Sequence, residues 1–142
     1  MSLDSKHQDI PFVSLVIEGL PLAWKAPFVG SHGAYSPRYN EMKIIRSIIK
    51  SQYSKDPVDF PMICDLIFFL PIPKSTSKKR RALMIEGKVR PIGPPDRTNL
   101  AKLYEDCLQG IVIMKDSRIV DGRVAKYYAE VPRTLIEIRE AL

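Results

Sequence analysis

Five polar residues beyond position 95 have types and spacing that suit chemistry on a phosphodiester. Asn99, Lys102 and Asp106 recur at helical spacing on one stripe of a predicted helix, and Asp96 stands at its start. Another carboxylate, Asp116, falls in a tight connection between two predicted strands. Carboxylates from separate elements can together hold Mg²⁺, which orients water and offsets phosphate charge. We therefore expect Asp96 and Asp116 to converge in a cleft, with a lysine nearby.

The same residues also fit a purely structural interpretation. Asp96 is a suitable helix N-cap, and Asp116 is a common turn residue. Asn99, Lys102 and Asp106 would then form a solvated helix face. Isolated acidic turn residues are frequent, so spacing alone favours this interpretation.

A strongly basic segment precedes these residues, in a chain whose net charge is +6. Its members surround a short Ser-Thr-Ser stretch; they are Lys74, Lys78, Lys79, Arg80 and Arg81. Lysine and arginine supply the salt-dependent part of DNA affinity, so the segment can contact phosphate, although a solvated loop has the same composition. Trp24 and Tyr35 can stack on bases or pack on their own domain.

The elements that must position these residues form one α+β domain. The chain has 142 residues, 45% of them hydrophobic, which is enough for one core. We expect a flexible tail over residues 1–11 and a single domain over residues 12–142, in which two main helices pack against a mixed, largely antiparallel sheet.

The predicted helices begin at recognisable capping residues. Ser36 and Pro37 open the first helix as N-cap and first helical residue, and Ser77 caps a short helix that ends near Gly87. The helix after Asp96 carries its apolar residues at the i, i+3, i+4, i+7 spacing and ends at Gly110.

The predicted strands follow runs of apolar and β-branched residues. The run 62–70 is nearly all apolar, which predicts a central strand covered on both faces. Residues 21–35 form an irregular loop or a long hairpin. The other predicted strands are residues 12–18, which we expect to be buried, and residues 111–114, 119–128 and 134–139.

Several classes of protein are disfavoured by the sequence. Cys64 and Cys107 sit in apolar runs, which indicates core thiols rather than a disulfide or zinc site. No apolar run approaches the length of a membrane span, and the polar first residues do not resemble a secretory signal, so we expect a cytoplasmic protein. No Gly-rich phosphate loop or nucleophile elbow is found, and no organic cofactor is expected.

The distribution of these motifs resembles the RusA family of Holliday junction resolvases, found in bacteria and their prophages. The likeness runs over about 12–140 and includes Gly19-x-Pro21 with Lys25, the Tyr35-Ser36-Pro37 helix start, and Pro71-Ile72-Pro73-Lys74. It is strongest in two motifs: Pro95-Asp96-x-Thr98-Asn99-Leu100-x-Lys102 followed by Glu105-Asp106-x-Leu108-x-Gly110, and Lys115-Asp116-Ser117-x-Ile119 with Lys126 beyond it.

This resemblance implies a metal-dependent endodeoxyribonuclease that resolves Holliday junctions by paired nicks in recombination and repair. It implies that Asp96 and Asp116 are catalytic carboxylates and that Lys102 is a catalytic cation. Mg²⁺ or Mn²⁺ would be bound by Asp96, Asp116, Thr98 and Asp106. DNA would be contacted by Lys25, Lys74, Lys78, Lys79, Arg80, Arg81, Asn99 and Lys126. The protein would be a homodimer, because a four-way junction offers two equivalent strands to a two-fold assembly.

Two positions depart from the family pattern. Thr98 stands where the family commonly has a second essential aspartate, and Lys115 stands for the first of its paired aspartates. Thr98 can still coordinate through its hydroxyl, or Asp106 or Glu105 can replace the missing ligand. The departures support an alternative, a protein that binds branched DNA without cutting it. A third hypothesis is a basic protein-interaction domain for which the segment 74–81 is dispensable in DNA binding.

Overall fold

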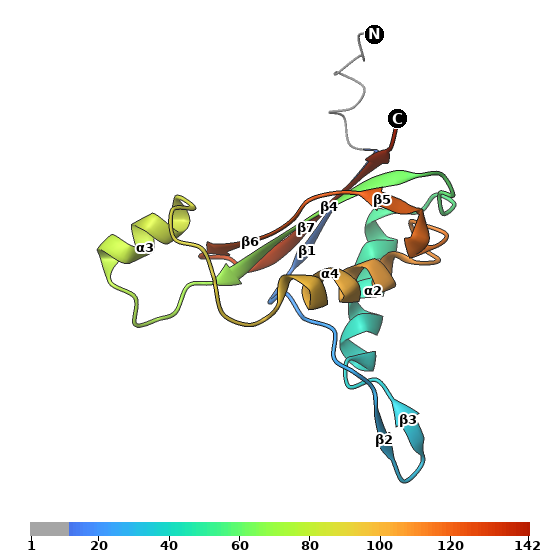
Figure 1. Ribbon diagram of the computed structural model, residues 1–142, viewed down its shortest axis with the longest axis horizontal. Coiled ribbons are helices and arrows are strands. Elements are labelled where there is room, and N and C mark those ends of the chain that lie inside the picture. The colour runs from blue at the N-terminus through green and yellow to red at the C-terminus, as the bar shows by residue number, and fades with distance from the viewer. Residues whose placement is uncertain (1–11) are drawn as a thin grey trace.

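The protein, seen in a computed structural model that describes residues 12–142, is built on one five-stranded sheet (Figure 1). The predicted tail, residues 1–11, lies outside the described residues. The strands of the main sheet are β1 (Val13–Glu18), β4 (Met62–Pro71), β5 (Ile119–Asp121), β6 (Val124–Ala129) and β7 (Arg133–Glu140).

The sheet is mixed and mostly antiparallel. β7 lies between β1 and β4 and is antiparallel to both. β5 and β6 both lie along the other edge of β4 and run parallel to it. The α+β fold expected from the sequence is therefore confirmed.

Two helices cover one face of this sheet, α2 (Tyr39–Gln52) and α4 (Arg97–Leu108) (Figure 1). Apolar side chains at helical spacing on α4 pack against alternate residues of the strands, which is the pattern of an amphipathic helix on a sheet. The completely buried members of this core include Ile49, Leu66, Phe68, Leu100, Leu103, Leu108, Ile136 and Ile138. The sheet therefore fixes which stripe of α4 faces outward.

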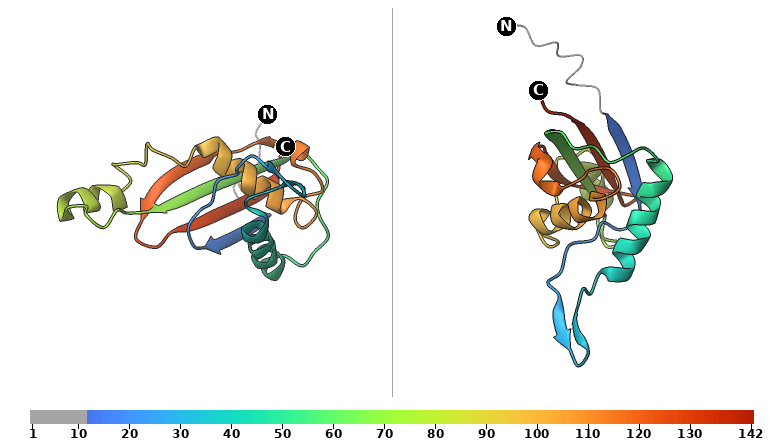
Figure 2. Two further views of the ribbon diagram at one scale, coloured as in Figure 1. Left: turned by 90° about the horizontal axis from the view of Figure 1, so that it is seen from below. Right: turned by 90° about the vertical axis from the view of Figure 1, so that its right-hand side faces the viewer.

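Within residues 12–142, no helix covers the opposite face of the sheet (Figure 2). Along β4, Met62 to Leu70 alternate between buried and partly exposed side chains, so the strand is central but not covered on both faces as predicted. β1 likewise alternates between buried and exposed side chains at the sheet edge, instead of being buried throughout. An apolar run does not reveal how a strand's second face is covered.

Two smaller elements project from this core (Figure 1). The segment 21–35 contains a hairpin of β2 (Phe28–Gly30) and β3 (Gly33–Tyr35), one of the two forms expected. The basic segment contains α3 (Lys78–Ile85), where the Ser77 hydroxyl caps the helix by accepting a hydrogen bond from the Arg80 N–H at 3.3 Å. Met84 is the only buried residue of α3. The segment 74–90, here called the arm, thus stands out from the body.

Three predictions about individual elements are wrong. α2 begins at Tyr39 with Arg38 at its N-cap; the Ser36 hydroxyl instead accepts a hydrogen bond from the Arg38 N–H and supports the turn before the helix. Residues 111–114 form turns and isolated bridges, and they are apolar because they are largely buried. The predicted strand 119–128 is divided at Gly122 into β5 and β6.

The two cysteines are buried free thiols, as predicted. Burial is the main cause that raises the pKa of Cys64 to about 12 and that of Cys107 to about 11. Within the described residues, no helix is both long and apolar enough to cross a membrane.

Candidate active site

The start of α4 is held firmly against the sheet. The Lys126 ammonium donates hydrogen bonds to the backbone carbonyls of Gly93 and Pro95, at 2.9 and 3.0 Å. The Arg97 guanidinium donates to the Val124 carbonyl at 3.0 Å. These contacts join the loop before the helix to β6. Lys126, predicted to bind DNA, therefore anchors this loop.

Asp96 occupies the N-cap position of α4, but its carboxylate makes no capping hydrogen bond to the helix. Asp96 therefore stands at the N-cap position expected from the sequence, but its exposed side chain does not cap the helix. A carboxylate at a helix N-terminus that is not used for capping remains available to a ligand.

A second acidic group lies at the other end of α4. The backbone N–H of Asp116 donates to the Gln109 side-chain oxygen at 3.1 Å, which fixes Asp116 beside the helix C-terminus. Burial and then the charge of Asp116 raise the pKa of Glu105 and of Asp106. Lys102 and Arg46 act in the opposite direction on Asp106. These carboxylates therefore repel one another when ionised, a condition that a bound cation relieves.

The expected convergence of Asp96 and Asp116 is not seen within one chain. The 13 positions from Asp96 to Gln109 correspond to about 20 Å of helical rise at about 1.5 Å per residue. Among residues 12–142, no three His, Cys, Asp or Glu side chains form a group that could hold a metal ion. Sequence spacing placed both carboxylates near α4 but did not show that they stand at opposite ends.

Lys102 lies near the middle of α4 and is held by an aromatic side chain. Its ammonium nitrogen is 3.7 Å from the centroid of the Trp24 ring, a cation–π contact. The backbone N–H of Trp24 donates to the backbone carbonyl of Asn99 at 2.9 Å, so the segment between β1 and the hairpin runs along the helix. Trp24, which the sequence left open between base stacking and packing, therefore positions a predicted catalytic residue.

Two hollows flank α4 near Lys102. The first, of about 300 Å³, contains Thr98, Lys102 and Glu105 on one stripe of the helix. The second, of about 550 Å³, lies between α2, α4 and the hairpin, and its lining residues are Trp24, Pro27, Ser36, Tyr39, Met42, Lys43, Arg46 and Asp106. Lys43 and Arg46 were not singled out from the sequence, because nothing in the sequence shows that α2 and α4 border one groove.

The predicted DNA-contacting lysines and arginines fall into separate regions. Lys74, Lys78, Lys79 and Arg80 are exposed on the arm, and Arg81 there forms a 3.5 Å ion pair with Glu130. Lys25 is exposed where the hairpin leaves the body. Asn99 is half-buried on α4, and its backbone carbonyl accepts from the backbone N–H of Trp24. Most of the predicted DNA-contacting residues thus lie on the arm.

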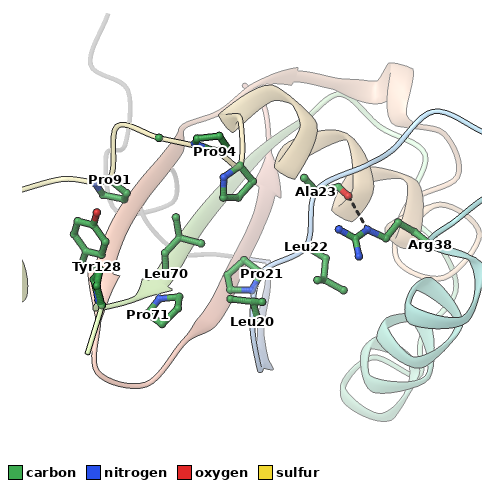
Figure 3. Close-up of a pocket in the computed structure, with 13 residues that line it drawn as sticks. Leu20, Pro21, Leu22, Ala23, Arg38, Leu70, Pro71, Pro91, Pro94 and Tyr128 are labelled. Atoms are coloured by element: carbon green, nitrogen blue, oxygen red, sulfur yellow. Dashed lines mark hydrogen bonds between the residues drawn. The ribbon is translucent and has the colours of Figure 1, made fainter. Parts of the chain in front are cut away.

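A third hollow, of about 450 Å³, lies between the segment after β1, the end of β4, the loop before α4 and the end of β6 (Figure 3). Prolines form much of its wall, including Pro21, Pro71, Pro91 and Pro94, and Arg38 is its one charged lining residue.

These features define a class: a basic α+β domain with acidic residues and a lysine on the outward side of one helix, together with a cationic arm suited to a polyanion. Residues 26–139 match the family of endodeoxyribonuclease RusA. The chain belongs to this family of endodeoxyribonucleases, which act on branched DNA junctions. It is also similar to Uncharacterized protein YqaN of Bacillus subtilis (strain 168), with 34% identity over 97 residues, covering 66% of this chain and 68% of that protein.

Proposed function

We propose that this protein is a divalent-metal-dependent endodeoxyribonuclease that resolves four-way DNA junctions by paired nicks during recombination and repair. The observation that carries the proposal is the acidic group at the C-terminal end of α4, next to Lys102, within a chain of the RusA family. The cationic arm supplies the charge that a polyanionic substrate requires.

The residues at this end of α4 fit a hard cation. Asp116 with either Glu105 or Asp106 would offer two carboxylates, and Mg²⁺ is often bound by one or two carboxylates with water and substrate phosphate completing its shell. Such a site needs no preformed group of three acidic side chains. Bound Mg²⁺ or Mn²⁺ would supply charge neutralisation at the phosphate and activation of water.

The chain's other residues would bind and orient the DNA. The Lys102 ammonium is available to a phosphate oxygen from its place on the Trp24 ring. Asp96 and Thr98 would act from the N-terminal end of α4, where the Asp96 carboxylate is not used as a cap. Because the helical rise of α4 separates Asp96 from the acidic group, we propose that Asp96 and Asp116 of one chain do not share an ion.

Cleavage of a synthetic four-way junction, with Mg²⁺, Mn²⁺ or chelator, tests this proposal. Wild type is expected to make paired, metal-dependent nicks, while Asp116→Asn and Asp96→Asn bind the junction but do not cut it. Calorimetry separates their roles: Asp116→Asn should lose metal binding in the absence of DNA, and Asp96→Asn should keep it. Metal binding that depends on Asp96 and not on Asp116 would overturn this assignment.

A second candidate is a protein that binds branched DNA without cutting it. The positions that favour it are Thr98 and Lys115, neither of which is acidic, together with the separation of Asp96 from Asp116. Tight, salt-sensitive junction binding with no nicks under either metal would establish this function instead.

We also propose that the working form is a homodimer. Two opposed strands of a junction must be cut, and a two-fold assembly presents one site to each. Sedimentation at several protein concentrations tests it. A monomer that nevertheless makes paired nicks in one binding event would contradict it.

A further inference from the structure

The uncovered face of the sheet carries a row of alternating cationic and aromatic side chains. Phe69 of β4 and Tyr127 of β6 are neighbours in register and stack with ring centroids 5.8 Å apart. The Arg133 guanidinium carbon lies 4.0 Å from the Phe69 centroid, and that of Arg90 lies 3.6 Å from the Tyr127 centroid. The row Arg133–Phe69–Tyr127–Arg90, here called the arginine row, crosses three strands and ends on the arm.

Arg123 joins this row from the connection between β5 and β6. Its guanidinium donates a hydrogen bond to the Tyr127 hydroxyl and lies 5.7 Å from the ring centroid. The hydrogen bond with Arg123 is the main cause that lowers the pKa of Tyr127. Three guanidinium groups thus converge on two solvent-accessible rings.

The positive charge of the row is not neutralised locally. Within residues 12–142, neither Arg90, Arg123 nor Arg133 forms an ion pair with a carboxylate. Glu18 is opposite Arg133 in the β1–β7 register, but the Arg133 guanidinium donates to the Val131 carbonyl. The nearby carboxylate of Asp65 accepts instead from Arg139 and from the backbone of Arg123.

Stacking leaves the edges of a guanidinium open to an anion. A guanidinium that lies flat on a ring directs its N–H groups outward in its own plane, which suits the oxygens of a phosphate. The row is also continuous with the arm, because Gly87 approaches the Tyr127 ring and Arg90 donates to the Lys126 carbonyl. A second copy of the chain would oppose like charges across this face, whereas a polyanion would neutralise them.

We infer that the arginine row is a second DNA-binding surface, which holds the phosphate backbone of a duplex arm of the junction on the face opposite α2 and α4. This inference rests on the proposed function for its substrate, but it concerns binding and not cleavage. A duplex leaving the site past the arm would meet Arg90 first and then Arg123 and Arg133.

The test is fluorescence anisotropy of a labelled four-way junction in chelator, over a series of salt concentrations. The variant Arg90→Ala/Arg133→Ala is compared with Lys50→Ala/Lys55→Ala, which removes the same charge near the end of α2. The row variant is expected to bind roughly tenfold or more weakly, with a salt slope lower by about 2, one for each lost phosphate contact. Binding equal to that of the lysine variant would overturn the inference.

Two further measurements keep the test specific. Tyr127→Leu should weaken binding because the platform for Arg90 and Arg123 is lost, while Tyr127→Phe should bind nearly as wild type. Sedimentation must show the same oligomeric state for all variants, and a change confined to the row variants would make the row a subunit contact and overturn the inference. Cleavage by wild type with metal is scored separately, so a protein that binds through the row without cutting refutes only the proposed function.

Discussion

At the scale of single residues, side chains on α4 owe their properties to neighbours that are distant in sequence. Lys102 lies on Trp24, which is 78 positions earlier, and the pKa values of Glu105 and Asp106 are raised by burial and by Asp116. The sequence predicted that Lys102 and Asp106 lie on one stripe of the helix, because helical periodicity is local, and the charge of Lys102 does act on the pKa of Asp106. The partner Trp24 was not predictable, since only the tertiary fold brings it to the helix.

The first prediction concerns Trp24 as a positioning residue for Lys102. Trp24→Leu removes the ring and should lower the single-turnover rate of junction cleavage roughly fivefold, equivalent to the loss of a cation–π contact of about 1 kcal/mol. Trp24→Phe retains a ring and should lie close to wild type. Junction affinity measured in chelator should change little in either variant. An equal loss of rate in Trp24→Phe and Trp24→Leu would show that Lys102 does not depend on an aromatic partner.

The second prediction concerns the pH dependence of stability through Glu105. Burial and Asp116 raise its pKa, so the native state keeps the proton to higher pH than the unfolded chain. The stability due to this group is therefore complete below the unfolded pKa, about 4.3, and is lost as pH rises through the folded pKa. Glu105→Gln should consequently be more stable than wild type at pH 7.

Urea unfolding in chelator between pH 4 and pH 8 measures this difference. The advantage of Glu105→Gln should shrink as the pH falls, because wild-type Glu105 then also becomes neutral. Glu18→Gln is the control, since Glu18 is exposed on β1. A Glu105→Gln variant that is less stable than wild type at pH 7 would contradict the prediction.

At the scale of elements, local patterns predicted some parts well and others poorly. β4, α3, α4 and β7 were predicted near their observed positions, because their apolar periodicity and caps are strong local signals. Residues 111–114 have the composition of a strand but form a largely buried loop. Their side chains are apolar because they pack in the core, not because the segment pairs in the sheet. The division of 119–128 depends on a contact between Gly122 and β4 that no local pattern reveals.

The third prediction tests that contact. Gly122 has a φ of 149°, and a Cβ on it would lie 1.9 Å from the Cys64 carbonyl oxygen and 2.8 Å from its carbon. Gly122→Ala must therefore displace the backbone of β4 or of the β5–β6 connection, and we expect a loss of several kcal/mol, about 3 or more. Gly93→Ala is the matched control, because a Cβ there meets nothing within 4 Å.

Thermal and urea unfolding measure both glycine variants. Gly93→Ala should stay within about 0.5 kcal/mol of wild type, as expected for an open surface position. Gly122→Ala should unfold far earlier or fail to fold. If the two variants were equally stable, the close approach of Gly122 to β4 would be refuted.

At the scale of the whole molecule, the sequence predicted one basic α+β domain. It did not predict the strand order or which face of the sheet the helices cover. Strand order follows from pairings between distant segments, such as β1 with β7, and these pairings decide that both helices lie on one face. The other face, expected to be covered, instead carries the arginine row, in which Phe69 and Tyr127 stay partly exposed. The placement of Asp96 and Asp116 at opposite ends of α4 likewise needed the tertiary structure.

The last prediction follows from the shape of the molecule, in which the arm carries charge but little of the core. Only Met84 of α3 is buried, so neutralising Lys78, Lys79 and Arg80 to Gln should change stability by no more than about 0.5 kcal/mol for each substitution. The same variant should bind a four-way junction at least roughly tenfold more weakly and with a reduced salt slope, because cations that contact phosphates are lost. Arg81 is left unchanged, since it pairs with Glu130.

Two comparisons show whether the arm binds DNA or is a basic surface with another function. Met84→Ala should destabilise the arm, and it shows what damage to the arm's folding does to binding when its charges are kept. The charge variant should instead keep the wild-type unfolding curve and lose affinity. Full junction affinity in that folded variant would mean that the arm is dispensable for DNA, and the arm would then have to be explained as a contact for another protein.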